Sequence, residues 1–339
     1  MKKIFNLFAL CAMTVAMFSC NKEVNVLPET ENEVSSTVAT KSGLTVEKPL
    51  KIVTYVETND ANPLNAGDYF MSDETTPFVD IVELFAANIH KETVNSVVRP
   101  TLYLNDKLTP VLEDGGYLTY VKPLQDLGIK VVLTVLGDWQ NIGVASMNST
   151  QQQQFAAILA YAVNRYGLDG IGFDDEYYGT ISTVSNSFGN IILYLRNLIG
   201  DDKLITVFDY GHTGSSQINS TAAAEIDYAY TDFSYWNTYS YISGMNSTPA
   251  RWAPCSYNLS YSFNSTYQTY YAQQAVNNDY GVIMFFNLRE NSVRDPLDDF
   301  QAISDGAFGG DEIVCVDGDQ LRDAGSVSGG YTITYDDIQ

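Results

Sequence analysis

Three consecutive acids, Asp174, Asp175 and Glu176, follow the apolar stretch LDGIGF at residues 168–173. Side chains two residues apart on a strand share a face, so Asp174 and Glu176 would project together, roughly 6.5 to 7 Å apart at the backbone, while Asp175 points away. Two carboxylates this close raise each other's pKa, and one can then stay protonated as a general acid near neutrality. Hydrolysis of glycosidic bonds requires such a pair. The alternative is an acidic cluster that caps a helix or faces solvent, which suits Asp175 best.

Strand-like and helix-like segments alternate from about residue 49 onward and would position these acids. The strand candidates are near-continuous apolar runs, as expected for strands buried on both faces of a parallel sheet. They are residues 51–58, 78–89, 130–137, 168–176, 204–211, 226–233, 252–259 and 280–288. Helical patterns that end at a glycine occupy 149–167 and 185–200. Eight strands alternating with helices predict an α/β fold, a single (β/α)8 TIM barrel, with an open doubly wound sheet as the alternative.

In a barrel of this type the active site lies at the carboxyl ends of the strands. Polar or aromatic residues at or near predicted strand ends are candidate substrate contacts, namely Glu57, Asn88, Asp138, Tyr210 and Asn287. Trp139 and Trp236 are each suited either to stacking on a sugar face or to ordinary packing. Arg289 and Arg294 place positive charge in an otherwise acidic chain, and we expect them in a rim loop paired with nearby acids.

The N-terminus has the layout of a bacterial lipoprotein leader. Lys2 and Lys3 precede an apolar run, and the run ends in MFSC, which resembles a lipobox. We expect residues 1–19 to be a signal peptide and Cys20 to carry a lipid anchor, with an ordinary signal peptide cut elsewhere as the alternative. Residues 20–48 would form the anchor and a flexible tether, and 49–339 the barrel with a C-terminal extension. This predicts an exported protein at the outer membrane or cell surface, attached by its lipid alone.

Net charge and the numbers of histidine and cysteine residues limit the classes of partner and cofactor that the chain can bind. A formal net charge of -23 disfavours nucleic acid and favours a neutral or cationic substrate. The chain has two histidines, and Cys255 and Cys315 are the cysteines left beyond the leader and anchor; neither set has the spacing of a zinc or redox motif. We therefore expect neither a metal nor a cofactor, and the two cysteines can pair or stay free.

The acidic stretch resembles the DxxDxDxE signature of glycoside hydrolase family 18. Longer segments resemble the bacterial endo-β-N-acetylglucosaminidases of that family, of the endoglycosidase H and F types, over nearly all of 49–315. In order, the segments are VTYVETNDANPLNAGDY (53–69), FAANI (85–89), PLQDLGIKVVLTVLGDWQ (123–140), YGLDGIGFDDEY (166–177), IDYAY (226–230) and YGVIMFFNL (280–288).

The resemblance implies cleavage between the two N-acetylglucosamine residues of the core of N-linked glycans, with high-mannose or hybrid glycans as the family expectation. It further implies a retaining mechanism without an enzyme nucleophile. Glu176 would protonate the glycosidic oxygen and later activate water, and the substrate's acetamido oxygen would attack its own anomeric carbon. Asp174 would hold the acetamido N–H. We expect a monomer that needs no cofactor.

Two positions depart from the family pattern. Gly172 stands where the signature has its first inner aspartate, which would leave Asp174 without a partner carboxylate. Phe233 stands where a tyrosine that binds the acetamido oxygen is expected, although Tyr230 or Tyr235 would supply the hydroxyl if the alignment shifts. A non-catalytic glycan-binding lipoprotein is therefore an alternative, and a chitinase is a second one.

Overall fold

The computed structural model describes residues 48–174, 176–261, 263–289, 295–318 and 321–338. The chain divides into two units, Met1–Leu44 and Thr45–Gln339, and all of the described residues belong to the second. The predicted signal peptide, the anchor at Cys20 and almost all of the tether therefore lie outside the described residues, as does Asp175. No helix in the described ranges is long and apolar enough to cross a membrane.

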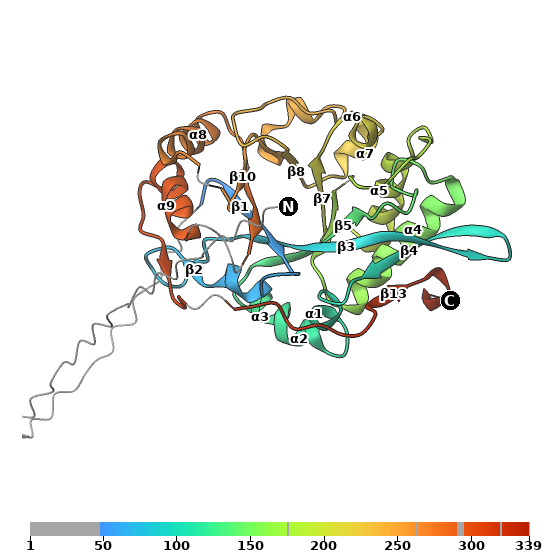
Figure 1. Cartoon of the computed structure of the whole chain (residues 1–339). Coiled ribbons are helices and arrows are strands. Elements are labelled where there is room, and N and C mark those ends of the chain that lie inside the picture. The colour runs from blue at the N-terminus through green and yellow to red at the C-terminus, as the bar shows by residue number, and fades with distance from the viewer. Residues whose placement is uncertain (1–47, 175, 262, 290–294, 319–320, 339) are drawn as a thin grey trace, which may run out of the picture. The chain divides into compact units, whose positions relative to one another are not determined.

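Nine parallel strands form a nearly closed barrel surrounded by helices (Figure 1). The strands are β1 (Lys51–Glu57), β3 (Ile81–Val94), β5 (Lys130–Gly137), β6 (Gly170–Asp174), β7 (Leu204–Asp209), β8 (Tyr228–Thr231), β9 (Trp252–Ala253), β10 (Ser256–Asn258) and β11 (Val282–Leu288). They pair in the order β10-β11-β1-β3-β5-β6-β7-β8-β9. Every predicted strand overlaps one or two of them, so the predicted TIM barrel is confirmed and the open sheet is excluded.

The barrel closes through an interrupted strand. The predicted strand 252–259 is two short pieces, of which β9 pairs with β8 and β10 pairs with β11. Pro254 stands between the two pieces, and a proline has no backbone N–H with which to continue the hydrogen-bonded ladder. The ladder therefore breaks at this residue and resumes on the other neighbour.

The helices cover the outside of the barrel. The long ones are α4 (Ser149–Arg165), α5 (Ser187–Ile199), α8 (Ser265–Asn277) and α9 (Pro296–Ala307), and the short ones are α1 (Thr109–Leu112), α2 (Gly116–Tyr120), α3 (Lys122–Asp126), α6 (His212–Ser215) and α7 (Ser220–Ala224). Both predicted helices, α4 and α5, are confirmed. Asn148 and Gln151 form a capping box that starts α4, and Gly200 ends α5 with a φ of 76°.

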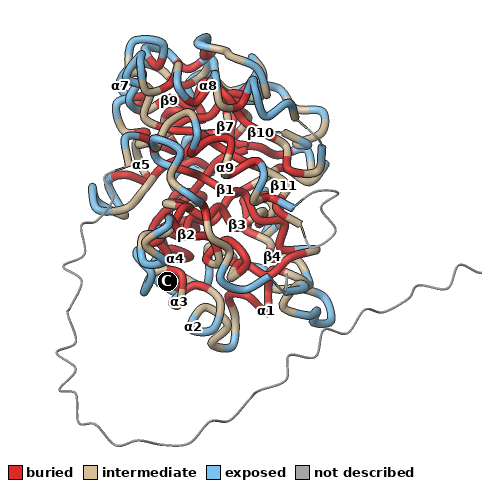
Figure 2. The backbone as a smooth tube through the Cα atoms, turned by 90° about the vertical axis from the view of Figure 1, so that its left-hand side faces the viewer, coloured by how far each residue is buried: buried red, intermediate tan, exposed pale blue. Residues whose placement is uncertain are grey.

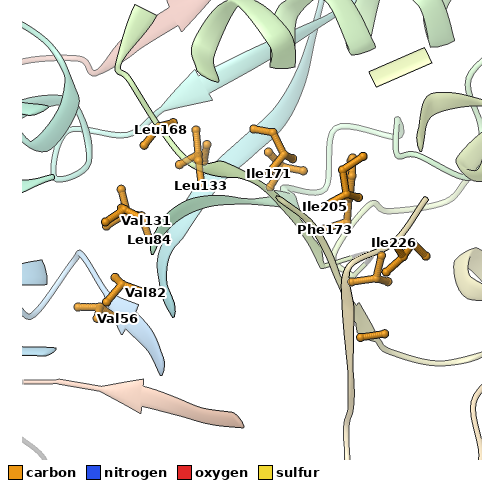
Figure 3. Packing of buried hydrophobic residues seen from close by; sticks show 14 of the residues in the cluster. Val56, Val82, Leu84, Val131, Leu133, Leu168, Ile171, Phe173, Ile205 and Ile226 are labelled. Carbon is orange, nitrogen blue, oxygen red and sulfur yellow. The ribbon is translucent and has the colours of Figure 1, made fainter. Parts of the chain in front are cut away.

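Two apolar layers hold the barrel together, one inside the strands and one between the strands and the helices. The inner layer consists of Val53, Tyr55, Ile81, Val132, Tyr230, Ala253, Val282 and Met284. The outer layer includes Leu133, Ile171, Phe173 and Ile205, which alternate with inward-facing residues (Figure 3). The strands are buried while exposed stretches gather on the surrounding helices and loops (Figure 2).

One strand extends well beyond its predicted end. β3 continues past Ile89 to Val94 and turns at Asn95 and Ser96, both with positive φ, into the antiparallel β4 (Val97–Leu104). The C-terminal strand β13 (Tyr331–Ile333) adds to the free edge of β4, ahead of the 3-10 turn Tyr335–Ile338 (Figure 1). The C-terminal extension is thus seated on a hairpin outside the barrel. A separate two-stranded sheet joins β2 (Tyr69–Phe70) to β12 (Val314–Cys315).

Candidate active site

A cavity of about 400 Å³ opens at the carboxyl ends of the barrel strands. Its apolar and aromatic lining comes from Tyr55, Phe85, Tyr177, Phe208, Tyr210, Met284 and Phe286. Its polar lining comes from Glu57, Asp174, Glu176, Asp232, Asn287 and Arg289. Sugar rings offer apolar C–H faces and polar edges, and a pocket of aromatic walls with a few converging polar groups suits such a ligand.

Asp174 and Glu176 both line this cavity, at the end of β6. Asp174 is the last residue of the strand and only 4% exposed, whereas Glu176 lies in the loop just beyond it. Burial raises the pKa of the Glu176 carboxyl to about 7, so that about half of this group is protonated at neutrality. The sequence predicted a raised pKa through repulsion by Asp174. The cause that the described structure gives is instead the loss of solvent around Glu176.

Two tyrosines stand beside Glu176. The negative charge of Glu176 is the first cause of the raised pKa of the Tyr177 and Tyr210 hydroxyls. Tyr210 is 46% exposed, and its ring stacks on Phe208 with 6.4 Å between the ring centroids. Both tyrosines therefore lie close enough to Glu176 for its charge to act on their hydroxyls, and both line the cavity. Tyr210 was predicted as a substrate contact and Tyr177 was not, although it directly follows the acid in the chain.

Gly137, the last residue of β5, allows the Glu176 loop to pass close to the barrel. A Cβ at this position would stand 2.2 Å from the carbonyl oxygen of Glu176 and 2.6 Å from the amide nitrogen of Tyr178. The neighbouring Trp139 amide donates a hydrogen bond to the carbonyl oxygen of Tyr177. The loop that carries the acid is thus fixed by backbone contacts with the end of β5.

Replacing Gly137 with alanine is expected to displace Glu176 without unfolding the barrel. A shift of about 1 Å in a reacting group can cost about 100-fold in rate, so we expect kcat to fall by about that factor while the melting temperature changes little. The matched control is Gly318→Ala, because an added Cβ there meets no atom within 4 Å. Wild-type kcat in a well-folded Gly137→Ala variant would show that the close approach does not position the acid.

The opposite side of the cavity carries an ion-pair cluster. Arg289 Nη2 lies 3.3 Å from Glu57 Oε2, and Arg289 Nη1 donates to Asp60. Asn287 Nδ2 donates to Asn258 Oδ1 over 2.9 Å, which fixes the amide plane at the end of β11. Glu57 and Asn287 thus lie where the sequence placed them, at strand ends in the mouth. Arg294, the second predicted rim arginine, lies outside the described residues.

The structure does not bring Tyr230 or Phe233 into the cavity lining. Tyr230 is fully buried below it, and its hydroxyl donates to Glu83 over 3.2 Å. Phe233 is 37% exposed and packs against Tyr235, with 4.8 Å between the ring centroids. The hydroxyls available beside Glu176 are therefore those of Tyr177 and Tyr210. Neither Tyr230 nor Tyr235 takes that place, because Tyr230 is buried below the cavity and Tyr235 lies outside its lining.

Four further candidates also lie outside the lining. Asn88 pairs with Tyr103 in the hairpin, and Asp138 Oδ2 lies 2.7 Å from His90 Nε2, so both belong to the base of that hairpin. Trp139 is 68% exposed and tilts against Tyr177, a lining residue, at 5.9 Å. Trp139 therefore extends the rim, whereas Trp236 packs edge-on against Tyr280 at 5.2 Å.

A buried acid that the sequence did not single out lies at the floor of the site. Glu83 of β3 is fully buried; its Oε2 accepts a hydrogen bond from Thr134 Oγ1 (2.7 Å), and its Oε1 accepts one from Thr206 Oγ1 (2.5 Å). Burial raises the pKa of Glu83 to about 7. A Cβ at Gly172 would stand 2.3 Å from Glu83 Oε2. At Gly172 the chain thus lacks the inner aspartate of the motif, and the Glu83 carboxyl group from β3 occupies the space that a side chain at position 172 would take.

The described residues contain no group of three or more His, Cys, Asp or Glu side chains that could hold a metal ion. Cys255 is buried and Cys315 half-buried, and both are free, which resolves the open question of their pairing. The polar groups that this part of the chain brings to the site are carboxyl, hydroxyl and amide groups and the Arg289 guanidinium. A TIM barrel with two neighbouring carboxyl groups in its mouth is the arrangement found in glycoside hydrolases.

Comparison with known proteins identifies the family. The chain is 31% identical to endo-β-N-acetylglucosaminidase F1 of Elizabethkingia meningoseptica over 240 residues, which cover 67% of this chain and 69% of that protein. It is 34% identical to an endo-β-N-acetylglucosaminidase of Flavobacterium sp. (strain SK1022) over 262 residues, which cover 75% and 78%. No family model matches the sequence. The chain belongs to the endo-β-N-acetylglucosaminidases of glycoside hydrolase family 18.

Solved structures show the same fold. EndoBT-3987 of Bacteroides thetaiotamicron with a Man5GlcNAc product has a TM-score of 0.66 at 23% identity, covering 78% of this chain and 62% of that one. This chain thus spans about three fifths of the length of that protein. The same enzyme in complex with a Man9GlcNAc2Asn substrate has a TM-score of 0.65 at 22% identity, covering 78% and 67%. A chitinase of Rhizomucor miehei has a TM-score of 0.51 at 12% identity, covering 75% and 99%.

Proposed function

We propose that this protein cleaves the glycosidic bond between the two N-acetylglucosamine residues at the core of N-linked glycans, leaving one sugar on the asparagine. The observation that carries the proposal is the pair at the end of β6, in which Asp174 is buried and Glu176 has a pKa of about 7. The names of the two curated relatives support the reaction. The Man9GlcNAc2Asn substrate in a structure of the same fold supports the substrate class.

In the proposed mechanism, Glu176 donates its proton to the glycosidic oxygen as the bond to the anomeric carbon breaks. The acetamido oxygen of the sugar on the cleaved side attacks the same carbon and forms an oxazolinium-type intermediate. Asp174 accepts a hydrogen bond from the acetamido N–H and offsets the developing positive charge. Glu176, now deprotonated, removes a proton from water, which opens the intermediate with overall retention of configuration.

We further propose that the glycans are neutral, of the high-mannose or hybrid type. Among the described residues, the cavity lining combines six aromatic rings with four carboxyl groups, and the cation in this lining, Arg289, is engaged by Glu57 and Asp60. Aromatic faces bind the C–H faces of mannose and N-acetylglucosamine, whereas the carboxylates of sialylated branches would be repelled.

A panel of asparagine-linked glycopeptides tests both parts. Wild-type protein is incubated with high-mannose, hybrid and sialylated complex glycopeptides and with a chitin oligomer. The products are separated by chromatography and identified by mass spectrometry. Release from the first two, with one N-acetylglucosamine left on the peptide, supports the proposal. Saturable binding without cleavage would favour a glycan-binding protein, and cleavage of the chitin oligomer alone would favour a chitinase.

The proposed acid role predicts the alkaline limb of the pH profile. Glu176 must be protonated to act on the free substrate, and its protonated fraction falls as pH rises through its pKa of about 7. We therefore expect kcat/KM to decline above about pH 7, by about tenfold for each further pH unit. A profile that stays level up to pH 9 would contradict the assignment of Glu176 as the acid.

From the sequence alone we propose that the protein is an exported monomeric lipoprotein anchored through Cys20. Acylation at this cysteine would hold the barrel on a membrane, with residues 21–48 as spacer. Cys20→Ser is expected to move the protein from the membrane fraction to the soluble fraction in a cell fractionation experiment. An unchanged distribution would count against the anchor.

A further inference from the structure

We propose that Glu83 is a positioning residue of the active site, which supplies from β3 the inner carboxyl group that β6 lacks at Gly172 and thereby fixes the charge and orientation of Asp174. The proposal rests on the function proposed above for Asp174 and Glu176. It concerns how this chain sustains that chemistry with a glycine in its acidic motif.

The pairing of the strands shows that Glu83 fills the place of a side chain at position 172. Gly172 lies directly between Thr134 of β5 and Thr206 of β7 in the sheet register. The hydroxyls of both threonines donate to the two oxygens of the Glu83 carboxyl group. A Cβ on Gly172 would stand 2.3 Å from Glu83 Oε2 and 2.8 Å from Thr206 Oγ1. The carboxyl of Glu83 and a side chain at 172 therefore exclude each other.

Electrostatics places Glu83 close to the catalytic pair. Asp174 follows Gly172 by two residues on the same strand and therefore points to the same side. The pKa of the buried Tyr55 hydroxyl is raised well above its usual value, first by burial, then by the charge of Glu83 and then by that of Asp174. Coulomb interactions fall with distance, so the two carboxyl groups lie close to the same hydroxyl, between the floor and the mouth of the site.

Burying the Glu83 carboxyl group lowers the stability of the fold, because its charged form loses contact with water. A well-packed apolar side chain is often as stable as, or more stable than, a buried charged group with its partners. Here three hydroxyls, from Thr134, Thr206 and Tyr230, hold the carboxyl in one orientation. The pKa of Glu83, raised by burial to about 7, lets it gain or lose a proton in the range where Glu176 works. Of the titratable groups around it, Tyr230 donates a hydrogen bond to Glu83, and the charge of Glu83 acts on the Tyr55 hydroxyl.

The first test is Glu83→Gln, which keeps the shape, removes the charge and replaces one acceptor oxygen with an NH2 donor, to which a threonine hydroxyl can turn its lone pair. We expect kcat on a high-mannose glycopeptide to fall at least tenfold with KM within about twofold, and the pH profile of kcat/KM to change shape. The matched control is Asp299→Asn, a buried acid of α9 that accepts from Gln268 over 2.6 Å, outside the cavity lining. Wild-type kcat and an unchanged profile in Glu83→Gln would overturn the proposal.

Moving the carboxyl from one strand to the other provides the second test. Glu83→Ala should lose at least about 100-fold in kcat, and Gly172→Asp alone should be destabilised because both carboxyl groups then compete for one space. The double variant Glu83→Ala/Gly172→Asp restores a single inner carboxyl, and we expect it to recover at least tenfold over Glu83→Ala. A folded double variant with no such recovery contradicts the proposed substitution of one group for the other.

A third measurement separates this proposal from the proposed function. If wild-type protein cleaves none of the glycans, the function fails, and the role of Glu83 is then read by carboxyl-carbon NMR titration of Asp174. In the wild type we expect Asp174 to titrate in two steps, because it is coupled to Glu83, and in Glu83→Gln in one step. An Asp174 titration that is identical in both proteins would overturn the proposal whether or not the protein is active.

Discussion

Replacing Glu176 with glutamine is expected to reduce kcat on a high-mannose glycoprotein by about 10²- to 10⁴-fold, the usual range for loss of a general acid and base. Glutamine has the size and polarity of the protonated acid and fits the same half-buried space, so binding should change little. It has no proton to give to the glycosidic oxygen and cannot take one from water. Both steps of the proposed mechanism therefore lose the same group.

Single-turnover and steady-state rates of Glu176→Gln, together with its affinity for the intact glycan, provide the measurement. Glu312→Gln is the matched control, since Glu312 is an exposed glutamate outside the cavity lining. A Glu176→Gln variant that retains kcat within threefold of the wild type would remove the acid from its proposed role. A variant that binds the glycan and leaves it intact would agree with it.

Asp174→Asn should reduce kcat by about 10²- to 10³-fold, comparable to the removal of one group that stabilises a charged transition state. Asp174 is 4% exposed, and asparagine is close to it in size, so the fold should persist. The variant loses the negative charge that would offset the positive charge of the intermediate. Its amide can also turn a donor towards the acetamido N–H, where an acceptor is required.

A substrate with a trifluoroacetamido group distinguishes orientation of the acetamido group from other effects of Asp174→Asn. The fluorines make the acetamido oxygen a poorer nucleophile, so the wild type should cleave this substrate more slowly than the natural one. Asp299→Asn again serves as the control for loss of a buried carboxylate. Equal rates on both substrates, together with near-normal kcat in Asp174→Asn, would contradict attack by the substrate's own acetamido group.

The barrel could be predicted because each of its strands has a local signal. Runs such as KVVLTVLG (130–137) are almost continuously apolar, as is typical of strands buried on both faces. The extension of β3 past Ile89 has no such signal, because the hairpin lies outside the barrel and the added residues, HKETV, are mostly polar. The break in the predicted strand 252–259 has a signal in the sequence, because Pro254 cannot donate a backbone hydrogen bond. Which neighbour each half would join depends on barrel closure, which a single sequence does not show.

The site was predictable where its residues adjoin a strand end. Glu57, Asp174, Glu176, Tyr210 and Asn287 were placed at the mouth on that ground, and all five line the cavity. Their chemical roles are still proposals.

Glu83 was missed because its proposed role depends on the absence of a side chain at Gly172. That glycine lies two strands away in the sheet and far away in the chain. The one local sign of Glu83 was an acid within the apolar run 81–87 at the start of β3. Tyr230 was misplaced for a related reason, since a shift of two residues along a strand separates the mouth from the floor.

The most direct test of the central claim is the intact mass of a high-mannose glycoprotein after incubation with the wild-type protein and, in parallel, with Glu176→Gln. The proposed function predicts that the wild type shifts the substrate to the mass of the polypeptide plus one N-acetylglucosamine per site, and that Glu176→Gln leaves it unchanged. A substrate that keeps its full mass after prolonged incubation with wild-type protein, or that loses both core sugars, would contradict the assignment.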